Sequence, residues 1–300
     1  MFRALVMFGV FGISVSASGT EKDPIDFSQL KNYAIFSEAA YLPRSRVDEI
    51  SQSHQYSLTH YNDVPGLAVS YYLLTNDKTK SQIIAVRGTF NIENTLLDMD
   101  AKLVTDPHAG VRLHRGFSTA AERIYREVKS FLKPDYTISG AGHSLGGAVS
   151  LVLAMYLDLD QFKIEKVVTF GQPKVTNIAG AAKFEHLNVY RLVTPDDLVP
   201  LVPPIDPMDI NDLDIYWHLG KEVILLADTR YAILEGVASM LRVANFTQQP
   251  ITESNLQNHQ MARYVSLLDS KIHAANLVPF EIDLNLFNLF GGGTETQIHQ

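Results

Sequence analysis

The feature that most constrains the fold of this chain is a serine set between glycines at the junction of a strand and a helix. Residues 135–157 read DYTISGAGHSLGGAVSLVLAMYL, with Ser144 between Gly142 and Gly146 in a G-x-S-x-G pattern. Residues 136–141 are typical of a short buried strand, and residues 147–157 place apolar side chains at helical spacing. A turn this sharp holds the serine hydroxyl above the sheet, and the glycines avoid collisions between strand and helix. The motif predicts a nucleophilic serine, although a glycine-rich turn without chemistry is the alternative for the motif by itself.

Strands and helices are predicted to alternate along the rest of the chain. Strands are expected at 67–74, 82–86, 166–170 and 189–193, with a hairpin strand at 222–226 and an edge strand at 280–290. Helices are expected at 27–41, 121–132, 231–243 and 256–269, the second opened by a capping box of Thr119 and Glu122, while residues 44–66 read as irregular. This alternation predicts an α/β fold with a mostly parallel central sheet and helices on both faces.

Composition narrows the class of protein further. The chain has 300 residues, 46% of them hydrophobic, which suits one large α/β domain, although the length also allows two. The formal net charge of −8, without a basic cluster, argues against nucleic acid as a partner. Because the sequence contains no cysteine, disulfides, cysteine metal sites and a thiol nucleophile are excluded.

The N-terminal residues are typical of a signal peptide. A short positive start is followed by the largely apolar stretch 4–15 and by small residues at 15–17. We therefore expect a signal peptide at 1–17, a hydrolase domain at 20–285 and a disordered tail at 286–300. The predicted location is secreted, or periplasmic in a bacterium; a buried N-terminal helix or an uncleaved anchor is the alternative.

A serine hydroxyl needs a base to accept its proton and an acid to orient that base. On a parallel sheet these groups come from loops at the carboxyl ends of strands, in the order Ser, Asp or Glu, His. Asp196 and Asp197 both follow the predicted strand 189–193, and His143, next to the serine, is expected to have at most a supporting role. Three downstream histidines are candidates for the base: His218 between aromatic residues, His259 at the start of the last predicted helix, and His273.

Motifs in a fixed order resemble those of the class 3 lipases, the fungal-type triacylglycerol lipase family with the α/β-hydrolase fold. They are Arg87-Gly88-Thr89, residues 94–98, His114-Arg115-Gly116-Phe117, the G-H-S-L-G-G-A segment at 142–148, residues 169–177, Asp197-Leu198-Val199-Pro200, and Asn258-His259 with Tyr264. The resemblance runs from about residue 30 to 270. Two departures are the lack of disulfides and Ala141 where the family has threonine.

The resemblance implies specific roles for the candidate residues. It favours Ser144, Asp197 and His259 as a catalytic triad that acts through an acyl-enzyme, with Gly142 and Gly146 as the elbow glycines. The backbone N–H groups of Thr89 and Leu145 would form the oxyanion hole. No cofactor and no metal are implied. His218 and Glu222 have metal-like i, i+4 spacing, for which we prefer a structural interpretation.

In this family, the segment after the oxyanion loop forms a lid over the site. Here it corresponds to about 90–102, where Phe90, Ile92, Leu96 and Leu97 would form the apolar underside; a fixed surface loop is the alternative.

The leading prediction is a secreted serine carboxylester hydrolase of lipase type that cleaves acylglycerols. A phospholipase A1 or a feruloyl-type esterase would use the same triad, and the sequence does not separate them. A non-catalytic lipid-binding protein is disfavoured because all three triad candidates are present, and the family motifs disfavour a peptidase. The expected partner is a lipid or other ester at an oil–water or membrane interface, with no obligate protein partner.

Overall fold

The computed structural model describes residues 24–64, 69–89, 102–203, 214–244 and 252–280. The predicted signal peptide 1–17, the lid candidates Phe90, Ile92, Leu96 and Leu97, and the predicted tail 286–300 lie outside the described residues, as does nearly all of the predicted strand 280–290.

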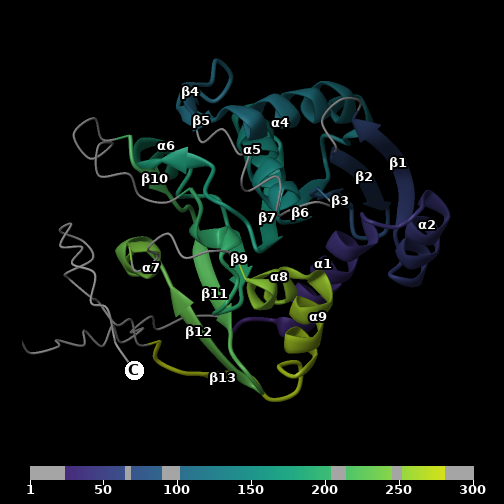
Figure 1. The fold of residues 1–300 in the computed structure, drawn as a ribbon. Helices are drawn as coiled ribbons and strands as arrows, with labels where there is room; N and C mark the ends of the chain where they lie inside the picture. Colours follow the sequence, from purple (N-terminus) through teal and green to yellow (C-terminus); the bar gives the residue numbers. More distant parts are fainter. Residues whose placement is uncertain (1–23, 65–68, 90–101, 204–213, 245–251, 281–300) are drawn as a thin grey trace, which may run out of the picture.

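A large twisted sheet organises the described part of the chain (Figure 1). Its nine strands are, in spatial order, β1 (Ser57–Val64), β2 (Val69–Asn76), β3 (Ser81–Val86), β6 (Thr137–His143), β7 (Lys163–Phe170), β9 (Val189–Val193), β11 (Lys221–Leu225), β12 (Arg230–Leu234) and β13 (Asn276–Leu277). The run from β3 to β11 is parallel, whereas β1, β2 and β3 pair antiparallel, as do β11 and β12. The predicted mostly parallel sheet is therefore confirmed.

Helices cover both faces of this sheet because successive strand residues point to opposite sides. Leu73, Ile84 and Val167 pack in one core with α4 (Arg115–Val128) and α5 (Leu145–Leu159). Their neighbours Leu74, Ile83 and Val168 pack in a second core with α1 (Phe27–Ala39) and α9 (Met261–Asp269). Figure 1 shows the pair α4 and α5 on one side of the strands and the pair α1 and α9 on the other. The remaining helices are α2 (Arg44–Ser53), α6 (Ile178–Lys183), α7 (Gly236–Ala244), α8 (Glu253–His259) and the short 3₁₀ turns η1 (Lys129–Phe131) and η2 (Val199–Leu201).

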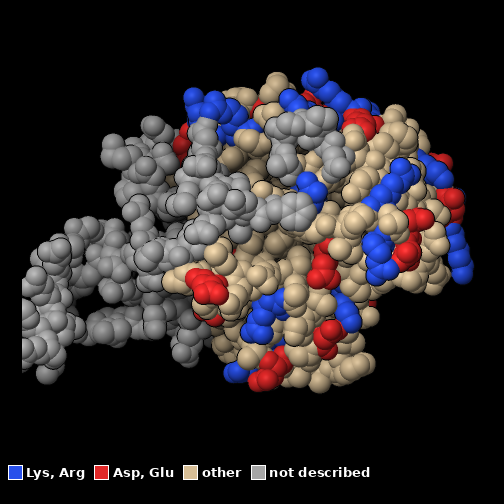
Figure 2. Space-filling view, turned by 45° about the vertical axis from the view of Figure 1, so that its right-hand side comes forward, with Lys and Arg blue, Asp and Glu red and all other residues tan. Residues whose placement is uncertain are grey.

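A second, smaller antiparallel sheet lies beside the helix pair α4 and α5. Its strands in the described residues are, in spatial order, β10 (Tyr216–Trp217), β8 (Thr176–Asn177), β5 (Arg112–His114) and β4 (Leu103–Thr105). None of the helices in the described ranges is long and apolar enough to cross a bilayer. On the face shown in Figure 2, acidic and basic side chains of the described residues are intermixed.

The prediction that residues 44–66 are irregular is wrong, because this segment contains α2 and β1. Both elements need few apolar residues. Helix α2 buries only Val47 and Ser51, and β1 is an edge strand with a neighbour on one side. The polar composition of residues 44–66 therefore gives little sequence signal for the helix and strand that they form.

Three helix predictions are wrong in their boundaries. Helix α4 begins at Arg115, so Thr119 lies inside it and donates to the carbonyl of Arg115 at 2.8 Å instead of capping. Residues 231–234 of the predicted helix 231–243 belong to strand β12, and α7 begins only at Gly236. The predicted helix 256–269 is two helices, α8 and α9, separated by an extended Gln260.

Candidate active site

Ser144 lies in the predicted turn between β6 and α5. Its backbone has φ 57° and ψ −132°, a region that a residue with a side chain rarely adopts and that costs about 1–3 kcal/mol. The Ser144 N–H donates to the carbonyl of Phe170 on β7 at 2.8 Å, which holds the turn against the neighbouring strand. Ser144 is only 1% exposed. The turn therefore holds the backbone of Ser144 in a strained conformation and fixes where the Ser144 side chain lies.

The two glycines that flank Ser144 allow this turn to close. A Cβ on Gly142 would lie 2.5 Å from the carbonyl oxygen of Gly146, and a Cβ on Gly146 would lie 2.2 Å from that of Val86. Real Cβ atoms do not approach backbone so closely. These glycines let the start of α5 pack directly on the end of β3, as the motif predicts.

The acid and base candidates meet at the carboxyl end of the parallel strands. Asp197 follows β9, and its Oδ2 accepts a hydrogen bond from Nδ1 of His259 at 2.8 Å. Both side chains are buried, at 0% and 3% exposure. Because Nδ1 is bound to Asp197, the free nitrogen of the neutral imidazole is Nε2, the nitrogen that a general base uses.

Asp197 is held as a charged carboxylate by several donors. Its Oδ2 also accepts from the Tyr264 hydroxyl at 2.5 Å, and its Oδ1 accepts from the Val199 N–H at 2.9 Å. Burial by itself would raise the pKa of Asp197, but the charge of His259 and the hydrogen bonds from His259, Tyr264 and Val199 together lower it. The carboxylate therefore stays ionised and fixed in place beside the imidazole.

Gly171 makes room for the pair of His259 and Asp197. It follows β7 with φ +58°, and a Cβ there would lie 2.7 Å from Oδ2 of Asp197 and 2.8 Å from Nδ1 of His259. Since Gly171 is the next residue after Phe170, which binds the Ser144 N–H, the same short segment contacts the serine turn and the acid–base pair.

His259 is the last residue of α8 and not the first residue of a helix, as the sequence suggested. Thr252 and Asn255 form a capping box that fixes the start of α8. The Asn255 amide donates to the carbonyl of Asp196 at 2.8 Å, and the Thr194 hydroxyl donates to that of Asn258 at 3.2 Å. Helix α8 is thus tied to the loop that carries Asp197, which brings the two side chains together.

The segment after β3 lies next to the serine turn. Val86 on β3 pairs with Gly142 on β6, and a Cβ on the following Gly88 would lie 3.2 Å from Cβ of Ser144. Thr89 comes directly after Gly88 and is half-buried. Leu145 is the first residue of α5, where a backbone N–H has no partner within the helix. The two predicted oxyanion donors therefore lie next to the serine turn: Leu145 directly follows Ser144, and Thr89 directly follows Gly88, which borders it.

Two buried polar atoms at this edge have no hydrogen-bond partner among the described residues, namely the Ser144 Oγ and the His259 Nε2. Buried polar atoms without a partner are uncommon and are concentrated where a structure has a functional reason for them. Nothing in the described residues competes with a reacting group for either atom.

The structure places the other histidine candidates away from this pair. His218 is buried, its Nε2 donates to the carbonyl of Pro200 at 2.7 Å, and burial lowers its pKa well below the usual value. Glu222 binds Ser239 and, at 2.6 Å, Arg242, so the spacing of His218 and Glu222 does not make a metal site. In the described ranges, no group of three His, Cys, Asp or Glu side chains is arranged to hold a metal. His273 is exposed.

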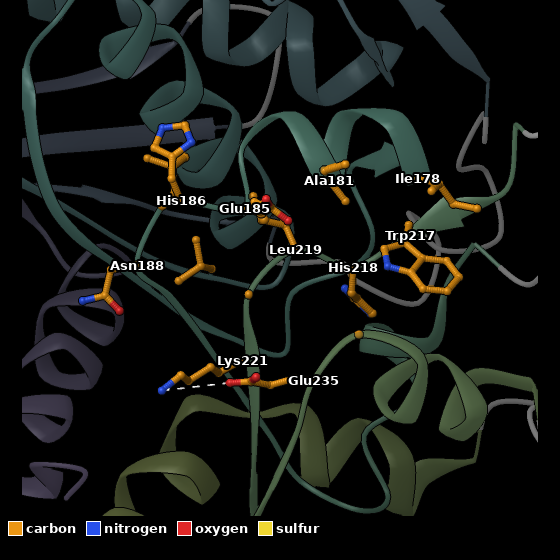
Figure 3. Close-up of a pocket in the computed structure, with 15 residues that line it drawn as sticks. Ile178, Ala181, Glu185, His186, Asn188, Trp217, His218, Leu219, Lys221 and Glu235 are labelled. Atoms are coloured by element: carbon orange, nitrogen blue, oxygen red, sulfur yellow. Dashed lines mark ion pairs between the residues drawn. The ribbon is translucent and has the colours of Figure 1, made fainter. Parts of the chain in front are cut away.

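A hollow of about 630 Å³ lies elsewhere in the described structure (Figure 3). It is lined by residues of α6, such as Ile178, and of the loops that precede β9 and β11, together with Trp217 of β10. Lys221 at the start of β11 also lines it, paired at 4.0 Å with Glu235, which follows β12. These loops come before the strands, whereas Asp197 comes after β9. The hollow therefore lies at the opposite edge of the sheet from the candidate triad.

Some contacts at the site had no signal in the sequence. Tyr41, which read only as an apolar residue at the end of the first helix, contacts His143 with its hydroxyl. Gly171 lies in a recognised motif, but its positive φ and its closeness to Asp197 follow from the tertiary structure alone. Tyr264 also lies in a motif, and its bond to Asp197 could not be read from spacing.

Comparison with known proteins shows which families and folds this chain resembles. The family model described as lipase (class 3) matches residues 83–206. A secreted mono- and diacylglycerol lipase 1 from Fusarium solani is 32% identical over 146 residues, which cover 46% of this chain and 44% of that protein. A lipase from Rhizomucor miehei is 28% identical over 158 residues, covering 47% of this chain and 42% of that protein. The alignments thus span less than half the length of these curated relatives.

Solved structures of lipases share the fold. Lipase II from Rhizopus niveus superposes with a TM-score of 0.58 at 23% identity, covering 71% of this chain and 84% of that chain. A triacylglycerol lipase whose catalytic centre is formed by a serine protease triad superposes with a TM-score of 0.57 at 23% identity, covering 70% and 83%. The fold is that of the α/β hydrolases. Within that fold, residues 83–206 match the class 3 lipase model, in agreement with the motifs that lie in this range; Asn258, His259 and Tyr264 lie beyond it.

Proposed function

We propose that this protein is a serine carboxylester hydrolase that cleaves acylglycerols through Ser144, His259 and Asp197. One observation carries the proposal: a buried His259–Asp197 hydrogen bond lies at the same sheet edge as a strained, buried serine. Gly171 contacts the pair, and its neighbour Phe170 holds the serine turn. Strain, burial and unpartnered reactive atoms gathered at one place are typical of a catalytic centre.

In the proposed reaction, Nε2 of His259 takes the proton of the Ser144 hydroxyl as Oγ attacks the ester carbonyl. Asp197 holds the imidazole in the tautomer that leaves Nε2 free, and it stabilises the imidazolium that forms. The imidazolium then gives its proton to the departing alcohol, which leaves Ser144 acylated. Water, activated by the same imidazole, releases the acid and restores the serine.

The negative charge of the tetrahedral intermediate needs donors that are already in place. We assign the backbone N–H groups of Leu145 and Thr89 to this role, because Leu145 directly follows Ser144 and Thr89 directly follows Gly88, which borders it. Each such donor is worth roughly 3–4 kcal/mol of transition-state stabilisation. The N-terminus of α5 adds its dipole at the same point.

Acylglycerols are the substrate class best supported by the relatives, which are named as lipases, one of them a mono- and diacylglycerol lipase. We also propose that the protein is exported and acts on lipid at an interface. The pattern of residues 1–17 is that of a signal peptide, and the Fusarium relative is named as secreted. N-terminal sequencing of protein recovered outside the producing cell tests export: a start downstream of residue 17 supports it, and a retained, uncleaved Met1 contradicts it.

The activity is tested with p-nitrophenyl butyrate, emulsified triolein, phosphatidylcholine vesicles and methyl ferulate, with wild type and Ser144→Ala side by side. The proposal expects the wild type to hydrolyse triolein faster than the phospholipid or the ferulate, and the variant to fall to background. Circular dichroism checks that both proteins are folded. Hydrolysis mainly of phospholipid or of ferulate would identify a phospholipase or a feruloyl-type esterase on the same triad. If folded wild type cleaves none of the four, the enzyme proposal fails, and vesicle binding then tests a lipid-binding role.

A further inference from the structure

A chain of hydrogen bonds crosses the site behind Ser144 and joins three separate segments. The Tyr41 hydroxyl lies 2.8 Å from Nδ1 of His143, the residue before the serine. Nε2 of His143 lies 2.7 Å from the backbone oxygen of His259. The backbone N–H of Gly88, next to Thr89, donates to the Tyr41 oxygen. This hydrogen-bond chain therefore contacts residues 88–89, which we call the oxyanion segment, as well as the serine turn and the proposed base. It includes no atom that is proposed to react.

The acceptor at one end fixes the direction of every bond in this chain. A backbone carbonyl only accepts, so His143 must carry its proton on Nε2 and donate it to the carbonyl of His259. The Nδ1 of a neutral imidazole is then an acceptor, so Tyr41 donates to it and accepts from Gly88. Only one tautomer of His143 satisfies all three contacts.

His143 and Tyr41 keep these protonation states wherever the proposed enzyme would work. Burial, with a smaller contribution from neighbouring His259, lowers the pKa of His143 to about 3. Burial raises the pKa of Tyr41 to about 12. Among the described residues, Asp197 and Tyr264 also face His143, and the charge of Arg87 acts on Tyr41. His143 therefore stays neutral while a general base beside it gains and loses protons.

The break between α8 and α9 supplies the acceptor for this chain. Gln260 is extended, with φ −69° and ψ 140°, so the helix does not continue through His259. The carbonyl at the end of a helix has no partner within the helix, and its burial would leave a polar group unpaired. His143 provides the missing donor, and its ring lies 4.5 Å, centroid to centroid, from the ring of His259.

We propose that Tyr41 and His143 are positioning residues that hold the oxyanion segment and the backbone of His259 in register with Ser144. This inference rests on the proposed hydrolase function. It assigns no chemical step to either residue: each acts through the geometry of its neighbours. Since misplacing a reacting group by a fraction of an ångström slows a reaction severely, loss of the chain lowers the rate of acyl transfer more than it lowers substrate binding.

The test compares Tyr41→Phe, His143→Phe and the double variant with a matched control, Tyr33→Phe. Tyr33 lies on α1, is 5% exposed, and its hydroxyl donates to the Ser139 hydroxyl on β6 at 3.0 Å. The control removes the same kind of hydrogen bond to the same strand, outside the chain. The measurements are kcat and KM with p-nitrophenyl butyrate, at a temperature where all variants are folded.

We expect Tyr41→Phe and His143→Phe, which each break the hydrogen-bond chain, to lower kcat roughly tenfold, equivalent to about 1.4 kcal/mol, with little change in KM. The double variant should lower kcat by far less than the roughly hundredfold product of the two single effects, because both substitutions break the same hydrogen-bond chain. His143→Gln, whose amide can still donate to the His259 carbonyl, should recover most of the rate. Tyr33→Phe should keep the wild-type kcat.

A second readout needs no ester substrate. The proton between His259 and Asp197 gives a strongly downfield resonance in proton NMR spectra, which should broaden in His143→Phe and persist in Tyr33→Phe. If kcat and this resonance are the same in Tyr41→Phe, His143→Phe and the control, the positioning role is wrong although the hydrolase stands. If the wild type shows the resonance but cleaves no ester, the proposed function fails. The resonance of the variants then still decides whether the hydrogen-bond chain through His143 positions His259.

Discussion

Replacing Gly171 by alanine tests whether the His259–Asp197 pair must lie where it does. The new Cβ would lie 2.7 Å from Oδ2 of Asp197 and 2.8 Å from Nδ1 of His259, against ordinary contacts that begin at 3.4 Å. The pair must therefore shift by about 0.6–0.7 Å or separate. Displacements of this size cost up to roughly 10²-fold in rate when they misalign a reacting group.

Gly171→Ala also strains the backbone, because Gly171 has φ +58°. That strain is worth about 1–3 kcal/mol of stability wherever it occurs, so it needs its own control. Gly236 offers one: it has φ +52°, and a Cβ there would meet nothing within 4 Å. Gly236→Ala carries a similar strain without the collision.

Urea unfolding gives the free energy of unfolding of both variants, and p-nitrophenyl butyrate gives kcat. We expect comparable losses of stability, a kcat reduced at least tens of fold in Gly171→Ala, and a wild-type kcat in Gly236→Ala. Equal kcat values in the two folded variants would refute the reasoning, because the collision would then have no consequence at the site.

Three further variants, Tyr264→Phe, Gly146→Ala and Arg242→Leu, test individual positions. Tyr264→Phe removes a donor to Asp197 and should lower kcat roughly tenfold, as the loss of one buried bond to a charged group implies. The folded-state pKa of Asp197 is lowered, so the ionised carboxylate contributes stability at neutral pH, and this contribution is lost as the pH falls through that pKa. Tyr264→Phe should raise this pKa. The midpoint of acid unfolding, followed by circular dichroism, should therefore move to higher pH in the variant. Gly146→Ala drives a Cβ into the end of β3 and should lower the melting temperature more than any other alanine variant named here, with calorimetry as the check. Arg242→Leu removes the closer of the two arginines paired with the buried Glu222, leaving Arg191 at 3.8 Å, and should cost up to about 3–5 kcal/mol in urea unfolding.

The sequence predicts best those elements whose pattern is set by burial on both faces. The predicted strands that correspond to β3, β7 and β9 are short apolar runs, and the helix after Ser144 is buried from Gly146 to Leu157. Elements at the margin of the fold were missed because they bury little: α2 buries only Val47 and Ser51. The extended Gln260, which divides the last predicted helix, has no proline or glycine to mark it.

The candidate site was predictable in its residue types but not in its contacts. Order along the chain and family motifs selected Asp197 and His259, and the structure brings those two side chains together. The contacts of Tyr41 and Gly171 join segments far apart in sequence, and spacing carries no information about them. His259 lies beside Asp197 although it ends its helix instead of beginning it, because the loop contacts of α8 decide where its side chain lies.

The central claim is that Ser144 is a nucleophile activated by its neighbours. The most direct test is reaction of the folded protein with a fluorophosphonate, followed by intact-mass measurement and peptide mapping. The account predicts one adduct per chain, located on Ser144, and none on Ser144→Ala. A folded wild type that takes up no label, or that carries the label on another residue, would contradict the account.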